Sequence, residues 1–355
     1  MRIVTFERHR SGAQETRPGL GSMGAAALGF ETLGAVRHGA RRLGALLTQG
    51  AHADSVVDLN RALAVKLAMD DVGAPEAEAD SLLPADVLHF LVHLPYALDA
   101  ARTALDFALE SLGRYDAPDL VAAGIVAPRQ WIRLCAPVPR PGKIVGVARN
   151  YAAHGAERGD REAPEEPVLF LKAPSAVIGP EDEIVVPAAV AQADYEGELA
   201  VVIGRRARRV AAEDALACVA GYCAANDVSA RDFQGVRGQH FLGKSCDSFA
   251  PLGPALVTPD EIPNPQELGI CTALSGEVVQ KGHTADMLFP VAHVIAFASR
   301  LMTLDPGDVI FTGTPAGVGA ARTPPRWLRE GDVVEIEIER VGRLANYVRS
   351  AQPRT

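Results

Sequence analysis

Two segments of the chain predict strands with different burial. In residues 334–339 a glutamate alternates with valine or isoleucine, which is typical of a half-buried strand with an acidic face in solvent. Residues 199–203 are instead an uninterrupted apolar run closed by Gly204. That pattern predicts a strand buried on both faces.

Acidic side chains stand at the start of the buried strand. Asp194, Glu196 and Glu198 are two residues apart, so a strand would place them on one side. Buried carboxylates need a positive partner, and the strand contains no lysine or arginine. A divalent metal ion could supply the charge, with Asp227, after a helix-like segment at 211–225, as a third candidate ligand. From spacing alone, a solvated acidic strand remains the alternative.

Residues 1–137 carry short strand patterns and one longer helical pattern. We expect strands at residues 3–6, 43–47 and 55–59, an amphipathic helix at 99–112, and an irregular glycine-rich loop at 19–34. Three prolines and a glycine within residues 136–142 predict an extended connector. The sequence therefore predicts two domains, 1–137 and 138–355.

The composition is that of an ordinary globular protein. The 355 residues are 48% apolar and 22% charged, with a net charge of −9, so the overall charge does not imply a nucleic-acid surface. No apolar run approaches the roughly 20 residues of a membrane-spanning helix, and we expect a cytoplasmic protein that binds neither membrane nor nucleic acid. Five scattered cysteines without a C-x-x-C pair indicate reduced thiols rather than disulfides or a zinc site.

A few polar residues have spacings that suggest chemistry. His154 and Glu157 would face each other on a helix, where the glutamate could orient the imidazole, although an exposed pair without function has the same spacing. His89 and a second histidine four residues later lack the glutamate of a metalloprotease helix, which favours a core or rim helix. Lys244 lies in a stretch of small and apolar residues, either reaching solvent or held in a site. Residues 305–319 form a turn, a buried strand and a glycine-rich loop that could bind an anion but has no dinucleotide fingerprint.

Five sequence motifs occur in an order that is typical of one family. They are GxxRNYxxHxxE at 146–157, DYEGELAVVIG at 194–204, GYxxxNDVSARDFQ at 221–234, FLGKS at 241–245 and MTLDPGDVIFTGTPAGVG at 302–319. Over about residues 137–348 the chain resembles the fumarylacetoacetate hydrolase family. The resemblance implies an α+β protein with a C-terminal domain of rolled β-sheets, a smaller and variable N-terminal α+β domain, and a homodimer.

The resemblance also implies a set of site residues. It assigns the binding of Mg²⁺, or of Mn²⁺ or Ca²⁺, to Glu196, Glu198 and Asp227. It assigns catalysis to His154, Glu157 and Lys244, and substrate binding to Arg231, Gln234 and Thr314. It makes the charged segment 155–167 a lid that orders over the substrate.

The expected substrate is a small 2-oxo acid. The resemblance implies hydrolysis of a C–C bond in a 2,4-dioxo acid, such as an acylpyruvate or fumarylacetoacetate, through a metal-bound enolate. The alternatives are a 2-oxo acid decarboxylase and an isomerase or hydratase of the 2-hydroxymuconate type in aromatic catabolism. A protein that only binds 2-oxo acids is a further alternative, and the shared motifs do not separate these activities.

Overall fold

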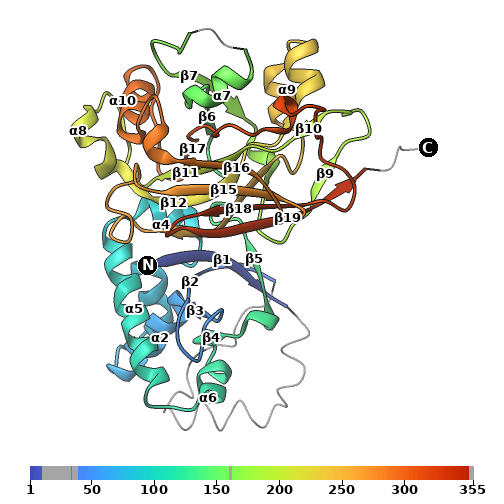
Figure 1. The fold of residues 1–355 in the computed structure, drawn as a ribbon. Coiled ribbons are helices and arrows are strands. Elements are labelled where there is room, and N and C mark those ends of the chain that lie inside the picture. Colours follow the sequence, from blue (N-terminus) through green and yellow to red (C-terminus); the bar gives the residue numbers. More distant parts are fainter. Residues whose placement is uncertain (10–32, 34–38, 160–161, 352–355) are drawn as a thin grey trace. The chain divides into compact units, whose positions relative to one another are not determined.

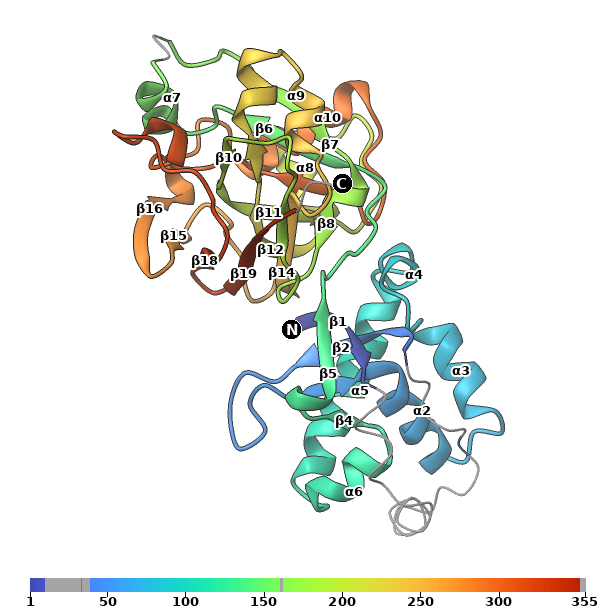
Figure 2. The same cartoon turned by 90° about the vertical axis from the view of Figure 1, so that its right-hand side faces the viewer.

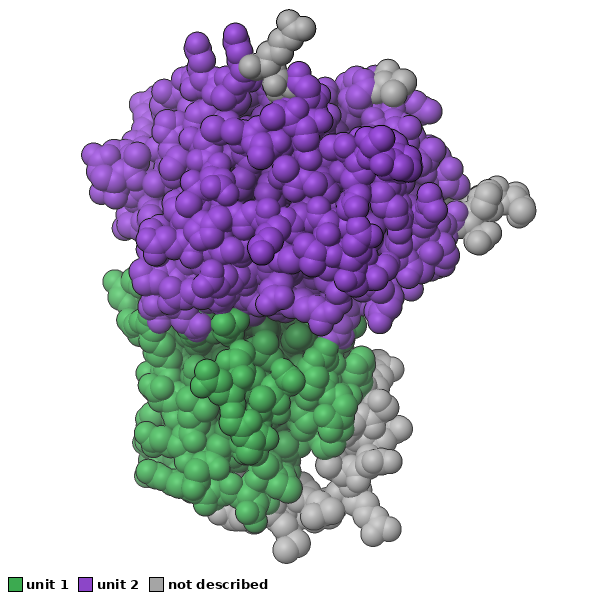
Figure 3. Space-filling model, viewed as in Figure 1, with its two compact units in different colours: residues 1–135 green, residues 136–355 purple. Residues whose placement is uncertain are grey.

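The computed structural model describes residues 1–9, 33, 39–159 and 162–351. The chain forms two compact units, Met1–Cys135 and Ala136–Thr355, which are coloured separately in Figure 3. Apart from Leu33, the glycine-rich segment expected to be a loop at 19–34 lies outside the described residues, as do Asp160 and Arg161 of the expected lid.

The first unit combines a sheet of short strands with helices (Figure 1). Its strands are β1 (Arg2–Arg8), β2 (Arg41–Leu46), β3 (Val56–Asp58), β4 (Val126–Ala127) and β5 (Ile132–Cys135). All pairings are antiparallel, in the order β4-β3-β2-β1-β5. Its helices are α2 (Leu59–Met69), α3 (Pro75–Leu82), α4 (Val87–Val92), α5 (Tyr96–Leu112) and α6 (Ala117–Ala122).

Local patterns predicted three strands and the longest helix of the first unit. β1, β2 and α5 confirm the strands expected at 3–6 and 43–47 and the helix at 99–112. The third strand ends at Asp58, because the side chain of Asp58 accepts a hydrogen bond from the backbone of Arg61 and begins α2 there. His89 is exposed on α4, as expected for a helix rim.

The second unit contains a six-stranded path through a larger sheet. Its strands are β6 (Ile144–Ala148), β7 (Val168–Lys172), β11 (Gly197–Ile203), β12 (Val219–Asn226), β14 (Ala250–Val257) and β17 (Val309–Phe311). They follow the order β14-β12-β11-β17-β6-β7, in which only β17 and β6 are parallel. Every residue of β11 is buried, which confirms the expected doubly buried strand.

A second sheet shares one hydrophobic core with the first. The turned view in Figure 2 shows the strands of the two sheets beside each other. Its strands are β16 (Glu277–His283), β15 (Gly269–Leu274), β18 (Val333–Ile338), β19 (Gly342–Ser350) and β9 (Ile184–Val186), in this order. The helices of the unit are α7 (Ala152–Glu157), α8 (Ala212–Ala215), α9 (His240–Lys244) and α10 (Val291–Leu301). In β18 the valine and isoleucine side chains at 334, 336 and 338 are buried and the glutamates are not, so the half-buried strand is confirmed. The mixed α+β fold is also confirmed.

The helix expected at 211–225 is wrong. Only α8 is α-helical there, a 3₁₀ turn follows at Leu216–Cys218, and β12 begins at Val219. The segment pairs with β11 on one side and β14 on the other, and this tertiary pairing overrides the helix propensity of its alanines. Gly221 permits the close approach of β14, because a Cβ atom at Gly221 would lie 2.4 Å from the carbonyl oxygen of Val257.

From the sequence we also expected no membrane-spanning helix and no disulfide bonds. Among the described residues no helix is long and apolar enough to cross a membrane. All five cysteines are free thiols.

Candidate active site

Three buried carboxylates meet at one edge of the large sheet. Glu196 directly precedes β11, Glu198 is the second residue of that strand, and Asp227 directly follows the end of β12. These strands are antiparallel neighbours with Gly197 opposite Asn226, so the start of one lies beside the end of the other. One ligand atom from each carboxylate lies within 4.8 Å of the others, and all three residues are buried.

The protein supplies cations to this cluster from other elements. Lys244, at the end of α9, donates to Glu196 Oε2 at 2.7 Å and also to Asp227 Oδ2. Lys172, at the end of β7, donates to Asp227 Oδ1 at 2.6 Å. Glu196 and Asp227 are therefore neutralised by lysines that lie outside the two strands carrying the acids.

Arg231 adds a third cation behind the cluster. Its Nη2 donates to Glu196 Oε1 at 2.6 Å and its Nε to Asp194 Oδ2 at 2.9 Å. Asp194 also accepts hydrogen bonds from the backbone N–H groups of Gly319 and Ala320. Asp194 is thus a buried anchor for the arginine and for the loop after β17.

Glu198 is the carboxylate of the cluster that remains without a cation. Within the described part of the chain it forms no ion pair, and its Oε2 accepts a 2.7 Å hydrogen bond from Gly313 N. Burial, together with the charges of Asp227 and Glu196, raises the pKa of Glu198 well above its usual range. An unpaired buried carboxylate beside two others fits a divalent cation, which would accept oxygen ligands from all three.

The neighbouring pKa values follow from the same charges. Burial alone would raise the pKa of Glu196, but the charges of Lys244 and Arg231 outweigh it and hold this pKa well below its usual range. Burial would lower the pKa of Lys244, but Asp227 and Glu196 raise it. For Lys172 burial dominates and lowers the pKa despite its bond to Asp227.

His154 and Glu157 form the pair expected from their spacing. Both lie on α7, with His154 Nδ1 2.8 Å from Glu157 Oε1. The other oxygen, Glu157 Oε2, accepts a hydrogen bond from Gly317 N at 2.8 Å, and Gly317 O accepts one from the hydroxyl of Tyr195 at 3.1 Å. The glycine-rich loop after β17 therefore fixes the carboxylate that orients the imidazole.

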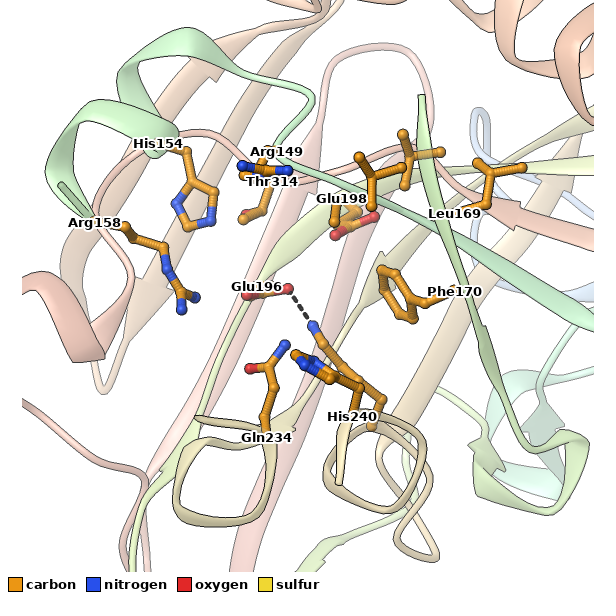
Figure 4. Close-up of a pocket in the computed structure, with 14 residues that line it drawn as sticks. Arg149, His154, Arg158, Leu169, Phe170, Glu196, Glu198, Gln234, His240 and Thr314 are labelled. Atoms are coloured by element: carbon orange, nitrogen blue, oxygen red, sulfur yellow. Dashed lines mark hydrogen bonds and ion pairs between the residues drawn. The ribbon is translucent and has the colours of Figure 1, made fainter. Parts of the chain in front are cut away.

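A cavity of about 530 Å³ brings most of the expected site residues together (Figure 4). Six of the nine line it: His154, Glu196, Glu198, Gln234, Lys244 and Thr314. The other three lie behind its wall: Asp227 binds the lysines, Glu157 binds His154, and Arg231 binds Asp194 and Glu196.

Two substrate-binding candidates are themselves held by hydrogen bonds. Arg231 Nη1 donates to Gln234 Oε1 at 3.0 Å. The Thr314 hydroxyl donates to Gly197 O at 2.9 Å and accepts from Gln280 Nε2 at 2.7 Å. Both side chains have defined orientations at the cavity wall.

Several residues of the site were not predicted from the sequence. Lys172 is fully buried, and the signal that could have identified it is a lysine closing the apolar strand VLFLK. The Phe170 ring lies 5.0 Å from Lys244 Nζ, a cation–π contact. The cavity wall also includes the basic side chains of Arg149, Arg158 and His240.

Comparison with known proteins identifies the family. The family model "Fumarylacetoacetate (FAA) hydrolase C-terminal" matches residues 143–349. The chain belongs to the fumarylacetoacetate hydrolase family. It is an enzyme of this family, whose members generally use a divalent metal ion, and the buried cluster of acids agrees with that use.

Several named relatives in this family are tautomerases or isomerases. The human protein named oxaloacetate tautomerase FAHD2A, mitochondrial, is 44% identical over 271 residues, which are 76% of this chain and 81% of the relative. The Bacillus subtilis oxaloacetate tautomerase YisK is 44% identical over 220 residues, which are 61% of this chain and 73% of the relative. A crystal structure titled 5-carboxymethyl-2-hydroxymuconate delta-isomerase, from Mycobacterium smegmatis, matches with a TM-score of 0.57 and 41% identity, covering 64% of this chain and 83% of that one.

These names correct the expected reaction. We expected hydrolysis of a C–C bond in a 2,4-dioxo acid, and the relatives named as tautomerases and isomerases contradict that expectation. They agree with the isomerase alternative. The motifs shared across the family did not distinguish hydrolysis from isomerisation.

Proposed function

We propose that this protein is a metal-dependent tautomerase that interconverts the keto and enol forms of a 2-oxo dicarboxylic acid of the oxaloacetate type. One observation carries the proposal: a histidine paired with a glutamate lines the same cavity as a buried cluster of carboxylates. The names of the relatives support the choice of reaction and substrate.

The carboxylates of Glu196, Glu198 and Asp227 would hold the divalent ion. When bound, such an ion polarises the 2-oxo group and so makes the neighbouring C3 hydrogens more acidic. Lys172 and Lys244 hold Asp227 in place from two sides, and Lys244 with Arg231 does the same for Glu196. These hydrogen bonds fix the ligand atoms before any ion enters.

His154 is the base of the proposed reaction. In the neutral imidazole whose Nδ1–H donates to Glu157, Nε2 carries a lone pair that can take a proton from C3 of the substrate. The C–H electron pair then forms the C2=C3 double bond, the carbonyl electron pair moves to the oxygen at C2, and that oxygen takes up a proton to give the enol. No carbon–carbon bond breaks, and the reverse sequence returns the ketone.

Lys244, Gln234 and Thr314 complete the proposed site from its walls. The ammonium of Lys244 adds positive charge near the oxygen at C2, where negative charge develops. The amide nitrogen of Gln234 can donate a hydrogen bond to the substrate carboxylate, whereas the Thr314 hydroxyl would first have to turn away from Gly197 O. Arg231 acts as a positioning residue for Glu196 and Gln234, because its hydrogen bonds go to protein atoms.

The reaction is tested by following the products of two substrates with the Mg²⁺- or Mn²⁺-loaded protein. Proton NMR of oxaloacetate should show faster keto–enol interconversion without faster formation of pyruvate. An acylpyruvate should give no pyruvate above the rate without protein. Enzyme-dependent pyruvate from either compound, without faster interconversion, would contradict the proposal.

A further inference from the structure

His240 is a second histidine in the wall of the cavity. It begins α9 and is exposed, whereas Lys244 at the end of the same helix is buried and contacts Glu196 and Asp227. Residues four apart lie on one face of a helix, separated by about 6 Å along its axis. His240 therefore lies above Lys244, on the solvent side of the acid cluster.

The position of α9 is fixed by close packing. A Cβ atom at Gly243 would lie 2.9 Å from the carbonyl oxygen of Ala230 and 3.0 Å from the backbone nitrogen of Gln234. Lys244 anchors the end of the helix through two ion pairs. The backbone of α9 thus holds the imidazole of His240 at the cavity.

The two histidines differ in their surroundings. Among the described residues that line the cavity, His154 and His240 are the histidines, and they come from different walls, α7 and α9 (Figure 4). His154 has the carboxylate of Glu157 beside it. In the described part of the chain no hydrogen bond or ion pair holds His240, so its imidazole can rotate and exchange protons with solvent through the cavity opening.

Tautomerisation needs proton transfer at two atoms. One proton leaves C3 and another joins the oxygen at C2, so a site with a base alone leaves the second transfer to water. Histidine is the side chain best suited to give and take protons near neutral pH. A second imidazole that reaches the substrate from another wall can serve the second atom.

We propose that His240 is the second acid/base residue of this site. This inference rests on the proposed function. As His154 takes the C3 proton, protonated His240 gives a proton to the oxygen at C2, and the C–H electron pair becomes the C2=C3 bond. In the reverse direction His240 takes the hydroxyl proton while His154 returns a proton to C3, and bulk solvent restores the protonation of both residues.

The variant His240→Ala tests the proposal, with His89→Ala as the control because His89 is exposed and lies outside the cavity. Calorimetric titration of oxalate into the metal-loaded proteins comes first, and equal affinity shows that the site is intact. We expect kcat for enol-to-ketone conversion to fall about 10²-fold or more in His240→Ala with KM nearly unchanged. Because His240 is exposed, added imidazole should restore part of the rate.

Other outcomes would overturn the inference in distinguishable ways. An unchanged kcat in His240→Ala, or a raised KM with an unchanged kcat, excludes a proton-transfer role while leaving the tautomerase proposal in place. The second pattern would make His240 a binding residue for the substrate's second carboxylate. A wild-type protein without tautomerase activity would overturn both proposals.

Discussion

Replacing Glu198 by glutamine should stabilise the metal-free protein. Glu198 is buried beside two other acids, and its carboxylate has one hydrogen bond from Gly313 and no ion pair among the described residues. Glutamine has nearly the same shape and can still accept that hydrogen bond. Keeping this buried carboxyl protonated costs about 1.4 kcal/mol for each pH unit above its unfolded-state pKa, so replacing it is worth about 1–3 kcal/mol roughly one to two pH units above that value. For a unit of this size that raises the unfolding midpoint by about 2–12 °C.

The advantage of Glu198→Gln should grow with pH. Folding raises the pKa of Glu198, so the unfolded chain loses this proton at a lower pH than the folded protein does. Wild-type stability therefore falls as pH rises from the ordinary glutamate pKa, about 4.3, towards the raised folded-state value. The variant lacks this proton and should not show that loss.

Added metal should reverse the order of stability. At an ion concentration 100 times Kd the wild type gains about 2.7 kcal/mol, and the variant, which lacks one ligand, gains much less. Thermal unfolding with a chelator and with Mn²⁺, from pH 5 to 8, measures both effects. Glu337→Gln, on the exposed face of β18, is the matched control and should change neither. A lower midpoint of Glu198→Gln in chelator would contradict the unfavourable burial of this carboxyl. Wild-type metal affinity in the variant would contradict its role as a metal ligand.

Three further changes test other parts of the site. Lys172→Met leaves Asp227 with one cation fewer in a buried setting and should destabilise the protein by about 3–5 kcal/mol in chemical denaturation; an unchanged midpoint would show that the pair contributes little. Gly317→Ala should destabilise the protein by about 1–3 kcal/mol, because φ is +108° there and a Cβ atom would lie 2.1 Å from a carbonyl oxygen of β16. The same change should lower kcat, because the N–H of Gly317 donates to Glu157, and full activity would contradict that role. Amide hydrogen exchange of residues 155–159 should slow when oxalate binds, as expected of a lid, and equal exchange at saturating oxalate would exclude it.

Local sequence patterns predicted the strands that carry the site. The apolar run before Gly204 predicted β11, and the alternation in β18 predicted its exposed glutamates. Both predictions were possible because neighbouring side chains of a strand point to opposite faces, so their polarity shows which faces are buried. Glu196 and Glu198 could be recognised as unusual from the same pattern, because they are acidic residues at the start of a strand predicted to be buried on both faces. Partners from distant segments could not be predicted, since Lys172 meets Asp227 only when β7 and β12 fold into one sheet.

Two expectations were wrong because the sequence motifs record neither strand pairing between distant segments nor the choice between related reactions. The segment 211–225 is rich in alanine and suggested a helix, but from Val219 onwards pairing with β11 and β14 made it a strand. The motifs pointed to a metal site and a base, yet hydrolysis and tautomerisation share both, and the expected hydrolysis was wrong. The homodimer and the cytoplasmic location stay predictions; the name of the human relative places that protein in mitochondria.

In the proposed tautomerisation His154 moves a substrate proton. The most direct test of this role is the rate at which the enol of oxaloacetate becomes the ketone, followed by ultraviolet absorbance, in the wild type and in His154→Gln. Both proteins must first be shown to bind Mn²⁺ and oxalate equally. We predict catalysis well above the spontaneous rate in the wild type and a loss of kcat of about 10²–10⁴-fold in the variant. Equal rates in the two proteins would contradict the role of His154, and a wild-type rate no faster than the spontaneous one would contradict the tautomerase activity itself.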